Sequence, residues 1–259
     1  MRMHVFAALI ALAPVTVACA RQQPAPDASA ATPAYLTAAI NDPARAADGK
    51  DDARRQIAAV MAFTGVKPGD SVLELVPGSG YWTRVFSAIV GPDGHVYTVW
   101  PKEMDKFSAK SYANWQSLTA TPHYKNVSLL KEPAAQLSVP QKVDVVFTSQ
   151  NYHDYHDPFM GPVDMQSFNK QVYDALKPGG VFVVIDHAAP AGSGAGDTNT
   201  LHRIDPMLVK KEVEAAGFKF DGQSDALRNP KDTHTDKVFD KSIRGHTDQF
   251  IYRFRKPKG

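Results

Sequence analysis

Histidine and aspartate side chains gather at two points where an apolar, strand-like run of the sequence ends. His153 and Asp154 lie in the segment 151–157 (N-Y-H-D-Y-H-D), and Asp186 with His187 closes a later run. An imidazole titrates near neutral pH and can take a proton from a nucleophile that attacks an electrophilic carbon. We therefore predict a catalytic group of His153, His187 and Asp154, in which one histidine is the general base and Asp154 or Asp186 orients it.

Further polar residues are predicted on the substrate side of the same site. His202 and Arg203 follow a stretch rich in glycine, alanine and serine (188–196) that could form a lid, and Asp186 ends a strand beside it. Arg45 lies in a charged run predicted to fold over the cleft and meet a carboxylate. The alternative for the loop residues is local capping or hydrogen bonding of the backbone. For Arg45 it is a solvated helix start.

The same histidines allow a metal site as a competing interpretation. Two or three imidazoles together with Asp186 are ligands that zinc or a related ion accepts. The spacing of His153 and His156 is not diagnostic when it falls in a loop. We therefore assign no metal ligand from the sequence.

A glycine-rich turn earlier in the chain predicts a ligand site of a different kind. The apolar run 72–76, which contains Glu74, leads through P-G-S-G (77–80) directly into a helix that starts at Tyr81. Glycines let a ligand approach the backbone closely, beside the free N–H groups of the helix N-terminus. In a parallel sheet such turns lie at the carboxyl ends of the strands, where open α/β folds bind ligands.

The elements that position these residues are short apolar strands that alternate with amphipathic helices. This alternation predicts a parallel sheet with helices on both faces. After Asp205, which can cap a helix that begins with Pro206, two strands follow without a helix between them, so we expect an antiparallel pair at the sheet edge. The predicted strands are 71–76, 95–100, 127–130, 143–148, 181–185, 218–227 and 249–254, and the predicted helices include 35–40, 52–63, 81–90, 165–176 and 205–217.

These blocks resemble a known enzyme family. The run E-L-V-P-G-S-G (74–80) is similar to the first motif of class I S-adenosylmethionine (SAM) methyltransferases, and L-K-P-G-G-V (176–181) resembles the family's turn into its fifth strand. The sequence is most similar to a group of exported bacterial members, from about Pro43 to the C-terminus. The blocks that carry this similarity are 78–83, 151–154, 201–205, 244–248 and 253–257.

The resemblance implies a Rossmann-like α/β fold with a mostly parallel seven-stranded sheet, an antiparallel C-terminal strand pair and helices on both faces. It also implies SAM as the cofactor. The residues it assigns to cofactor binding are Glu74, Pro77, Gly78, Ser79, Gly80, Tyr81, Trp100 and Asn151.

Two positions depart from the family pattern. Val76 stands where the first motif usually has a glycine, which implies a changed or weaker fit of SAM. The second strand ends in Trp100 and Pro101, without the acidic residue that normally binds the ribose hydroxyls. Glu103 is the nearest carboxylate, and Trp100 could instead stack on a ring.

The first twenty residues predict export. Arg2 precedes a short apolar run (5–18) that is followed by small residues, as in a secretory signal peptide cleaved after Ala20. In the alternative reading, T-V-A-C (16–19) is a lipobox and Cys19, the only cysteine, carries a lipid. We predict a signal peptide over 1–20, a disordered leader over 21–34 and one methyltransferase-like domain over 35–259, located in the periplasm or anchored to the envelope.

Composition limits the partners. The chain has 43% hydrophobic and 22% charged residues and a net charge of +2, so we expect no nucleic-acid partner. A membrane contact is expected only through an N-terminal lipid anchor, and the sequence does not define an oligomeric state. The predicted function is methyl transfer from SAM to a small molecule. The alternatives are a catalytically inactive SAM-fold protein that binds another small ligand, and a histidine-based metal-binding protein.

Overall fold

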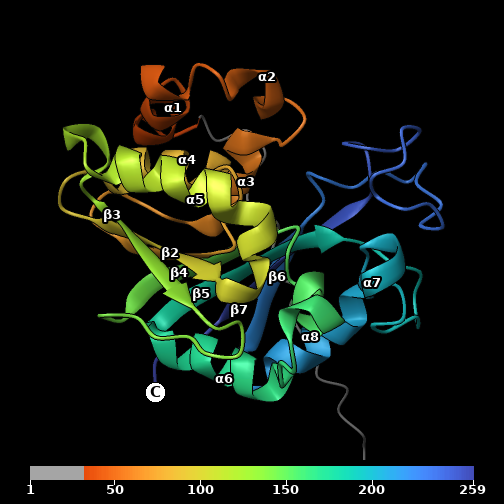
Figure 1. Cartoon of the computed structure of the whole chain (residues 1–259). Helices are drawn as coiled ribbons and strands as arrows, with labels where there is room; N and C mark the ends of the chain where they lie inside the picture. Colours follow the sequence, from red (N-terminus) through yellow and green to blue (C-terminus); the bar gives the residue numbers. More distant parts are fainter. Residues whose placement is uncertain (1–31) are drawn as a thin grey trace, which may run out of the picture. The chain divides into compact units, whose positions relative to one another are not determined.

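A mixed sheet of seven strands forms the centre of the fold (Figure 1). The computed structural model describes residues 32–259, so the predicted signal peptide, Cys19 and all but the end of the leader lie outside the described residues. Five strands run parallel, and the last strand pairs antiparallel with both of its neighbours. The strand order is β3-β2-β1-β4-β5-β7-β6. The strands are β1 (Ser71–Leu75), β2 (His95–Pro101), β3 (Val127–Glu132), β4 (Val143–Ser149), β5 (Leu176–His187), β6 (Lys219–Ser224) and β7 (Gln249–Arg255).

Helices cover both faces of this sheet. The α-helices are α1 (Ala34–Ile40), α2 (Gly49–Asp52), α3 (Ile57–Thr64), α4 (Tyr81–Val90), α5 (Asp105–Thr119), α6 (Met165–Ala175), α7 (Thr198–Leu201) and α8 (Pro206–Ala215). Helices α1, α3, α4 and α5 lie on one face, and α6 and α8 lie on the other (Figure 1). The predicted fold, with its parallel strands, antiparallel C-terminal pair and two helical layers, is confirmed.

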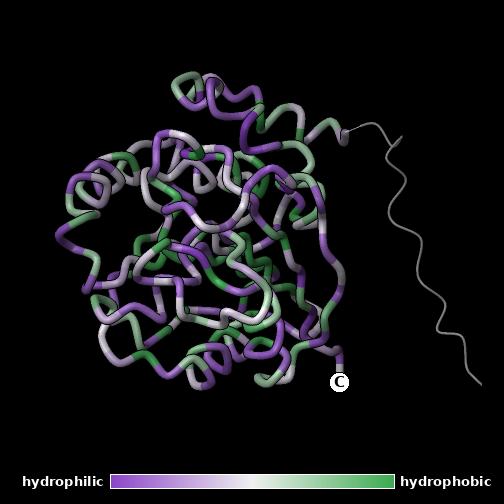
Figure 2. Tube along the Cα trace, turned by 90° about the vertical axis from the view of Figure 1, so that its right-hand side faces the viewer, coloured by the Kyte–Doolittle hydropathy of each residue, from purple (hydrophilic) through white to green (hydrophobic). Residues whose placement is uncertain are grey.

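The alternation of side chains along the buried strands explains the two cores. In β1, Val72 joins the core under α4, whereas Leu73 and Leu75 join the core under α6. Successive side chains of a strand point to opposite faces, so a strand buried on both sides must be apolar throughout. Figure 2 shows the same distribution, with hydrophobic residues in the interior and hydrophilic residues along the outer loops.

Helix ends follow the capping signals in the sequence. Asp205 accepts a hydrogen bond from the Met207 N–H at 2.8 Å with Pro206 at the first helical position of α8, as predicted. One predicted helix is interrupted. Residues 52–63 do not form one helix, because Gln56 adopts a left-handed conformation (φ 47°) between α2 and α3.

Three smaller 3₁₀ elements matter for the site. These are η2 (Lys102–Met104), η4 (His153–His156) and η5 (Pro158–Met160). Two more, η1 (Pro43–Arg45) and η3 (Pro122–Tyr124), lie outside it. Within the described part of the chain, no helix combines the length and the apolar character that crossing a membrane requires.

Candidate functional site

A cavity of about 300 Å³ lies at the carboxyl ends of β1, β2 and β4. The sheet order reverses direction at β1, which pairs with β2 on one side and β4 on the other, and open α/β sheets bind ligands at such a switch point. Predicted cofactor residues from three separate segments line this cavity. They are Gly78 and Ser79 after β1, Trp100 in β2 and Asn151 after β4.

The remaining wall of the cavity comes from α5 and its approach. Met104, Phe107, Ser108 and Ser111 line this side. The ring of Phe107 also packs edge to face against Phe159 of η5, with the ring centroids 5.8 Å apart. The segment that carries the polar residues after β4 is thereby connected to the rim of the cavity.

Val76 lines the cavity in an unusual backbone conformation. Its φ is +51°, in the left-handed region that β-branched residues rarely adopt. This explains why a glycine is usual here in the family, since glycine enters that region without steric cost. The valine therefore strains the turn and places an isopropyl group against the ligand space.

We expect Val76→Gly to give a more stable protein than Val76→Ala, by about 1 kcal/mol in the free energy of unfolding. Both substitutions remove the isopropyl group, but only glycine relieves the strain at positive φ. At ordinary positions alanine is the more stabilising of the two. Urea denaturation of both variants measures the difference, and an alanine variant at least as stable as the glycine variant would contradict the assigned backbone conformation.

Glu74 is buried and positions the turn without lining the cavity. Its Oε2 accepts a hydrogen bond from the Thr83 hydroxyl of α4 at 2.5 Å. Burial raises the pKa of the Glu74 carboxyl to about 7, and the Thr83 hydrogen bond opposes this rise only in part. Glu74 thus connects β1 to the first turn of α4, on either side of the glycine turn.

Two predicted cofactor residues, Gly80 and Tyr81, lie at the start of α4 and contact other parts of the protein. Gly80 has φ +82°, and a Cβ atom at this position would lie 2.1 Å from Nε1 of Trp115, so the indole requires glycine here. The Tyr81 hydroxyl donates to Asp52 Oδ1 at 2.6 Å, on the side of the N-terminal helices. Neither residue lines the cavity, and Pro77 does not line it either.

The end of β2 carries no free carboxylate toward the cavity. Trp100 donates its indole N–H to Thr98 Oγ1 at 2.9 Å and packs edge to face on Tyr112. Glu103 accepts a hydrogen bond from the Ala134 N–H at 2.8 Å and so holds the loop after β3. The Trp100 ring is therefore the cavity wall at the point where the family usually has an acidic residue.

The polar residues after β4 and β5 meet in one buried cluster. His153 donates from Nδ1 to Asp186 Oδ1 at 2.8 Å, and its backbone N–H donates to Asp186 Oδ2 at 2.8 Å. On the other side of the ring, Nε2 lies 3.4 Å from Asp154 Oδ1 and 3.3 Å from His202 Nδ1. The side chains of His153 and Asp186 are 3% and 0% exposed.

The charges of this cluster are strongly coupled. Burial by itself lowers the pKa of His153, but Asp186 and Asp154 outweigh it and raise the pKa to about 9. Burial favours the neutral form of Asp186, yet His153 outweighs it and holds that pKa below its usual value. For Asp154, burial dominates and raises the pKa to about 7.

His187 is close to His153 but has different partners. The ring centroids are 6.2 Å apart, so the two predicted histidines do lie together. His187 Nδ1, however, lies 2.7 Å from the Thr247 hydroxyl, and burial lowers its pKa to about 3. From His187, Asp186 accepts a hydrogen bond only from the backbone N–H, at 2.8 Å, and none from the ring. The carboxylate therefore orients His153, which makes His153 the stronger candidate for an acid–base role.

Three residues predicted on the substrate side are buried structural groups. Asp186 is enclosed and uses both oxygens within the protein. Arg203 is fully buried and forms two hydrogen bonds to Asp232, at 2.9 and 3.1 Å. Arg45 is buried against Asp52 at 2.8 Å and does meet a carboxylate, but away from the cavity. His202, the fourth residue predicted on the substrate side, is partly accessible, with a side chain that is 21% exposed.

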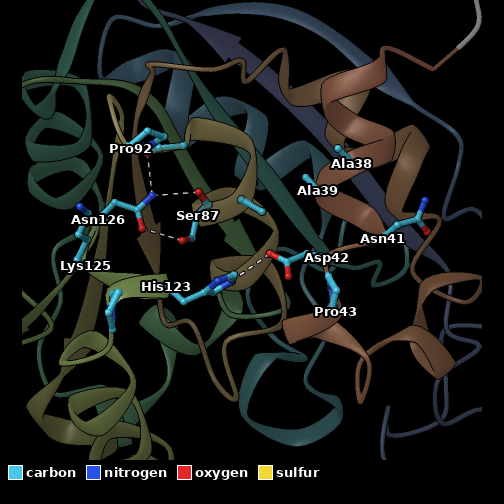
Figure 3. A pocket seen from close by; sticks show the side chains of 13 residues that line it. Ala38, Ala39, Asn41, Asp42, Pro43, Ser87, Pro92, His123, Lys125 and Asn126 are labelled. Atoms are coloured by element: carbon cyan, nitrogen blue, oxygen red, sulfur yellow. Dashed lines mark hydrogen bonds and ion pairs between the residues drawn. The ribbon is translucent and has the colours of Figure 1, made fainter.

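A larger cavity lies elsewhere and contains no residue of the buried histidine–aspartate cluster (Figure 3). It measures about 510 Å³ and is formed by α1, η1, the end of α4 and η3. His123 and Asp42 pair across it at 3.1 Å, and Asn126 donates to the carbonyls of Ser87 and Gly91. Ser87 and Gly91 mark the end of α4, at the amino side of the sheet, so this cavity is separate from the switch point.

Comparison with known sequences points to methyltransferases. Residues 43–133 match the family model described as protein-L-isoaspartate(D-aspartate) O-methyltransferase. A protein-L-isoaspartate O-methyltransferase from Ignicoccus hospitalis is 43% identical over 47 residues, which is 18% of this chain and 22% of that protein. The ubiquinone/menaquinone biosynthesis C-methyltransferase UbiE of Ectopseudomonas mendocina is 25% identical over 200 residues, 73% of this chain and 64% of UbiE. The chain thus spans less than two thirds of these relatives.

Solved structures show the same fold. A SAM-dependent methyltransferase from Aquifex aeolicus aligns with a TM-score of 0.55 at 18% identity, over 85% of this chain and 97% of that one. The glycopeptide N-methyltransferase MtfA in complex with SAM gives 0.52 at 15% identity, over 77% and 86%. The [4+2]-cyclase SpnF gives 0.57 at 17% identity, over 80% and 82%.

The topology, the cavity at the switch point and these alignments define a Rossmann-like methyltransferase fold. The chain has the fold of class I SAM-dependent methyltransferases, and residues 43–133 are also similar in sequence to a methyltransferase family. The closer similarity to exported bacterial members stays a prediction.

Proposed function

We propose that the protein is a SAM-dependent methyltransferase that acts on a small molecule in the cell envelope. The observation that carries this proposal is the cavity at the ends of β1, β2 and β4. Gly78 and Ser79 offer backbone groups beside the N-terminus of α4, and Trp100 offers an aromatic wall. MtfA, which shares the fold, was crystallised with SAM, S-adenosylhomocysteine and sinefungin.

The acceptor is proposed to bind on the side of η4. Asn151 lines the cavity, and His153 follows two residues later with Asp154 and His202 beside it. A polar, largely water-excluded group of this kind can activate an acceptor nucleophile next to the methyl donor. The cavity volume of about 300 Å³ favours a small molecule over a folded macromolecule as the acceptor.

Methylation of isoaspartyl residues is the second candidate for the reaction. It is favoured by the family match, but that match ends at residue 133, after β3. The acceptor side, formed by residues after β4 and β5, lies outside the matched segment. The match therefore supports the cofactor half of the proposal, and an isoaspartyl peptide belongs among the acceptors to be tested.

The location in the envelope rests on the sequence. The n-region at Arg2, the apolar run 5–18 and the small residues before Ala20 support export. Fractionation of cells that express the full chain would test it. Cys19→Ser is expected to move the protein from the membrane fraction to the soluble fraction if the lipobox is used.

Calorimetry of the full chain with SAM and S-adenosylhomocysteine tests the cofactor site. We expect both compounds to bind, and Ser111→Trp to weaken binding at least tenfold, because Ser111 lines the cavity and a large side chain would fill it. Ser117→Trp is the matched control, since Ser117 is exposed on the same helix α5. Absence of binding by either compound at millimolar concentration would favour the alternative of a SAM-fold protein with another ligand.

Turnover is measured separately, as transfer of labelled methyl from SAM. The acceptor preparations are a small-molecule extract of the envelope and an isoaspartyl peptide. Label in the small-molecule fraction supports the proposal, whereas label only in the peptide favours the second candidate. SpnF, a cyclase with this fold, shows why turnover needs its own assay, since the fold alone does not define the reaction.

A further inference from the structure

Three side-chain atoms of the kinds that bind metal ions converge in the buried cluster after β4 and β5. Nε2 of His153 lies 3.3 Å from Nδ1 of His202 and 3.4 Å from Oδ1 of Asp154, and the last two atoms are 4.0 Å apart. The residues come from two segments, η4 after strand β4 and the end of α7 after strand β5. They are mostly buried, with side-chain exposures of 3% for His153, 11% for Asp154 and 21% for His202.

We propose that His153, Asp154 and His202 bind a divalent transition-metal ion. Two imidazole nitrogens and one carboxylate oxygen are a ligand set that Zn²⁺ and Fe²⁺ accept. An ion about 2.0–2.2 Å from each ligand atom places tetrahedral neighbours about 3.4 Å apart. Two of the three observed distances already have this value, and the third requires His202 and Asp154 to approach each other by about 0.6 Å.

The surroundings of His153 have the arrangement expected around a metal ligand. Its Nδ1 donates to Asp186 at 2.8 Å, and Asp186 is in turn held by the backbone N–H groups of His153 and His187. Metal-binding histidines commonly donate their other ring N–H to a carboxylate, which selects the tautomer and directs the free lone pair at the ion. Here the other ring nitrogen is Nε2, which faces Asp154 and His202.

A second observation is an uncompensated carboxylate next to the three ligands. Asp157 is 1% exposed, and neither of its oxygens accepts a hydrogen bond from residues 32–259. Its backbone N–H donates to the Asp154 carbonyl at 2.9 Å, and Asp154, Asp157 and Asp186 are all buried. Buried charges without partners are costly, and a divalent cation at the proposed position would compensate them.

Three protein ligands leave coordination positions free. His202 is the most exposed of the three ligands, at 21%, and its ring packs against Phe239 at a centroid distance of 4.8 Å. An oxygen of the methyl acceptor would be a suitable additional ligand, and this point rests on the proposed function. The metal site itself does not, because ion binding is measured without SAM or acceptor.

Titration of the full chain with Co²⁺ and Zn²⁺, after removal of metals with a chelator, tests the site. Co²⁺ gives a visible spectrum that changes when protein ligands replace water. We expect one equivalent to bind, with Zn²⁺ displacing Co²⁺, and His202→Asn to lower the affinity at least tenfold. Asparagine suits this position because His202 has a left-handed backbone (φ +55°) that asparagine tolerates. Asp154→Asn is a second, nearly isosteric variant.

His156→Asn is the matched control. His156 lies in the same element η4, but its Nε2 faces Glu212 at 3.3 Å, so its loss should leave the Co²⁺ spectrum and affinity unchanged. Circular dichroism confirms that each variant is folded. The proposal is overturned if the folded wild-type chain binds no equivalent of Co²⁺ or Zn²⁺ near neutral pH. Binding that His202→Asn and Asp154→Asn leave unchanged would also overturn it. If the wild-type chain binds no ion, a proton on His153 would hold the cluster together.

Discussion

Arg203→Ala is expected to lower the free energy of unfolding by about 3–5 kcal/mol, because it leaves a buried charge without its partner. The guanidinium is fully buried and pairs with Asp232, which is 1% exposed. It also donates to the carbonyls of Ala188 at 3.0 Å and Asp236 at 2.9 Å. One side chain therefore connects the end of β5 to the long polar loop before β7, which has no regular secondary structure of its own.

Urea denaturation of the wild type, of Arg203→Ala and of Arg244→Ala measures this effect. Arg244 is exposed in the same region, so its loss should change stability by less than about 0.5 kcal/mol. Adding Asp232→Asn to Arg203→Ala should recover part of the loss, since asparagine leaves no buried charge. If Arg203→Ala lowers the free energy of unfolding by less than about 1 kcal/mol, the structural role is contradicted and the predicted substrate contact is favoured.

Gly80→Val is expected to lower the free energy of unfolding by about 3 kcal/mol or more and to abolish SAM binding. Two effects add. The backbone at Gly80 has φ +82°, and a Cβ atom would lie 2.1–2.3 Å from the Trp115 indole. The indole cannot retreat easily, because it is fully buried and its N–H points at the Ser79 carbonyl at 3.3 Å. The clash therefore displaces the turn that lines the cavity.

Gly78→Ala separates the clash from the backbone strain. Gly78 also has positive φ (+58°), but no atom lies within 4 Å of a Cβ at that position. We expect Gly78→Ala to cost about 1 kcal/mol, and Gly80→Ala to cost clearly more. Thermal denaturation and calorimetry with SAM are the measurements. Equal costs at the two glycines would mean that the contact with Trp115 is not what requires glycine at position 80.

Local signals in the sequence determined much of the fold. The apolar run 71–76, the glycine turn after it and the stripe of α4 predicted β1, the cavity edge and the helix, because period and turn chemistry are properties of neighbouring residues. The cap at Asp205 was predicted in the same way. Helix α5 was missed, since among its residues only Trp115 is buried and no apolar stripe marks it.

The contacts between distant segments were decided only by the tertiary structure. Trp115 explains Gly80, yet the two residues are far apart in the chain and no local pattern relates them. The sequence by itself placed His153, Asp154 and His202 at strand ends and beside a lid. That Nε2 of His153 faces both other residues depends on the pairing of β4 with β5 and on the left-handed turn at His202. Side-chain direction at loop residues follows from such long-range packing, which periodicity cannot report.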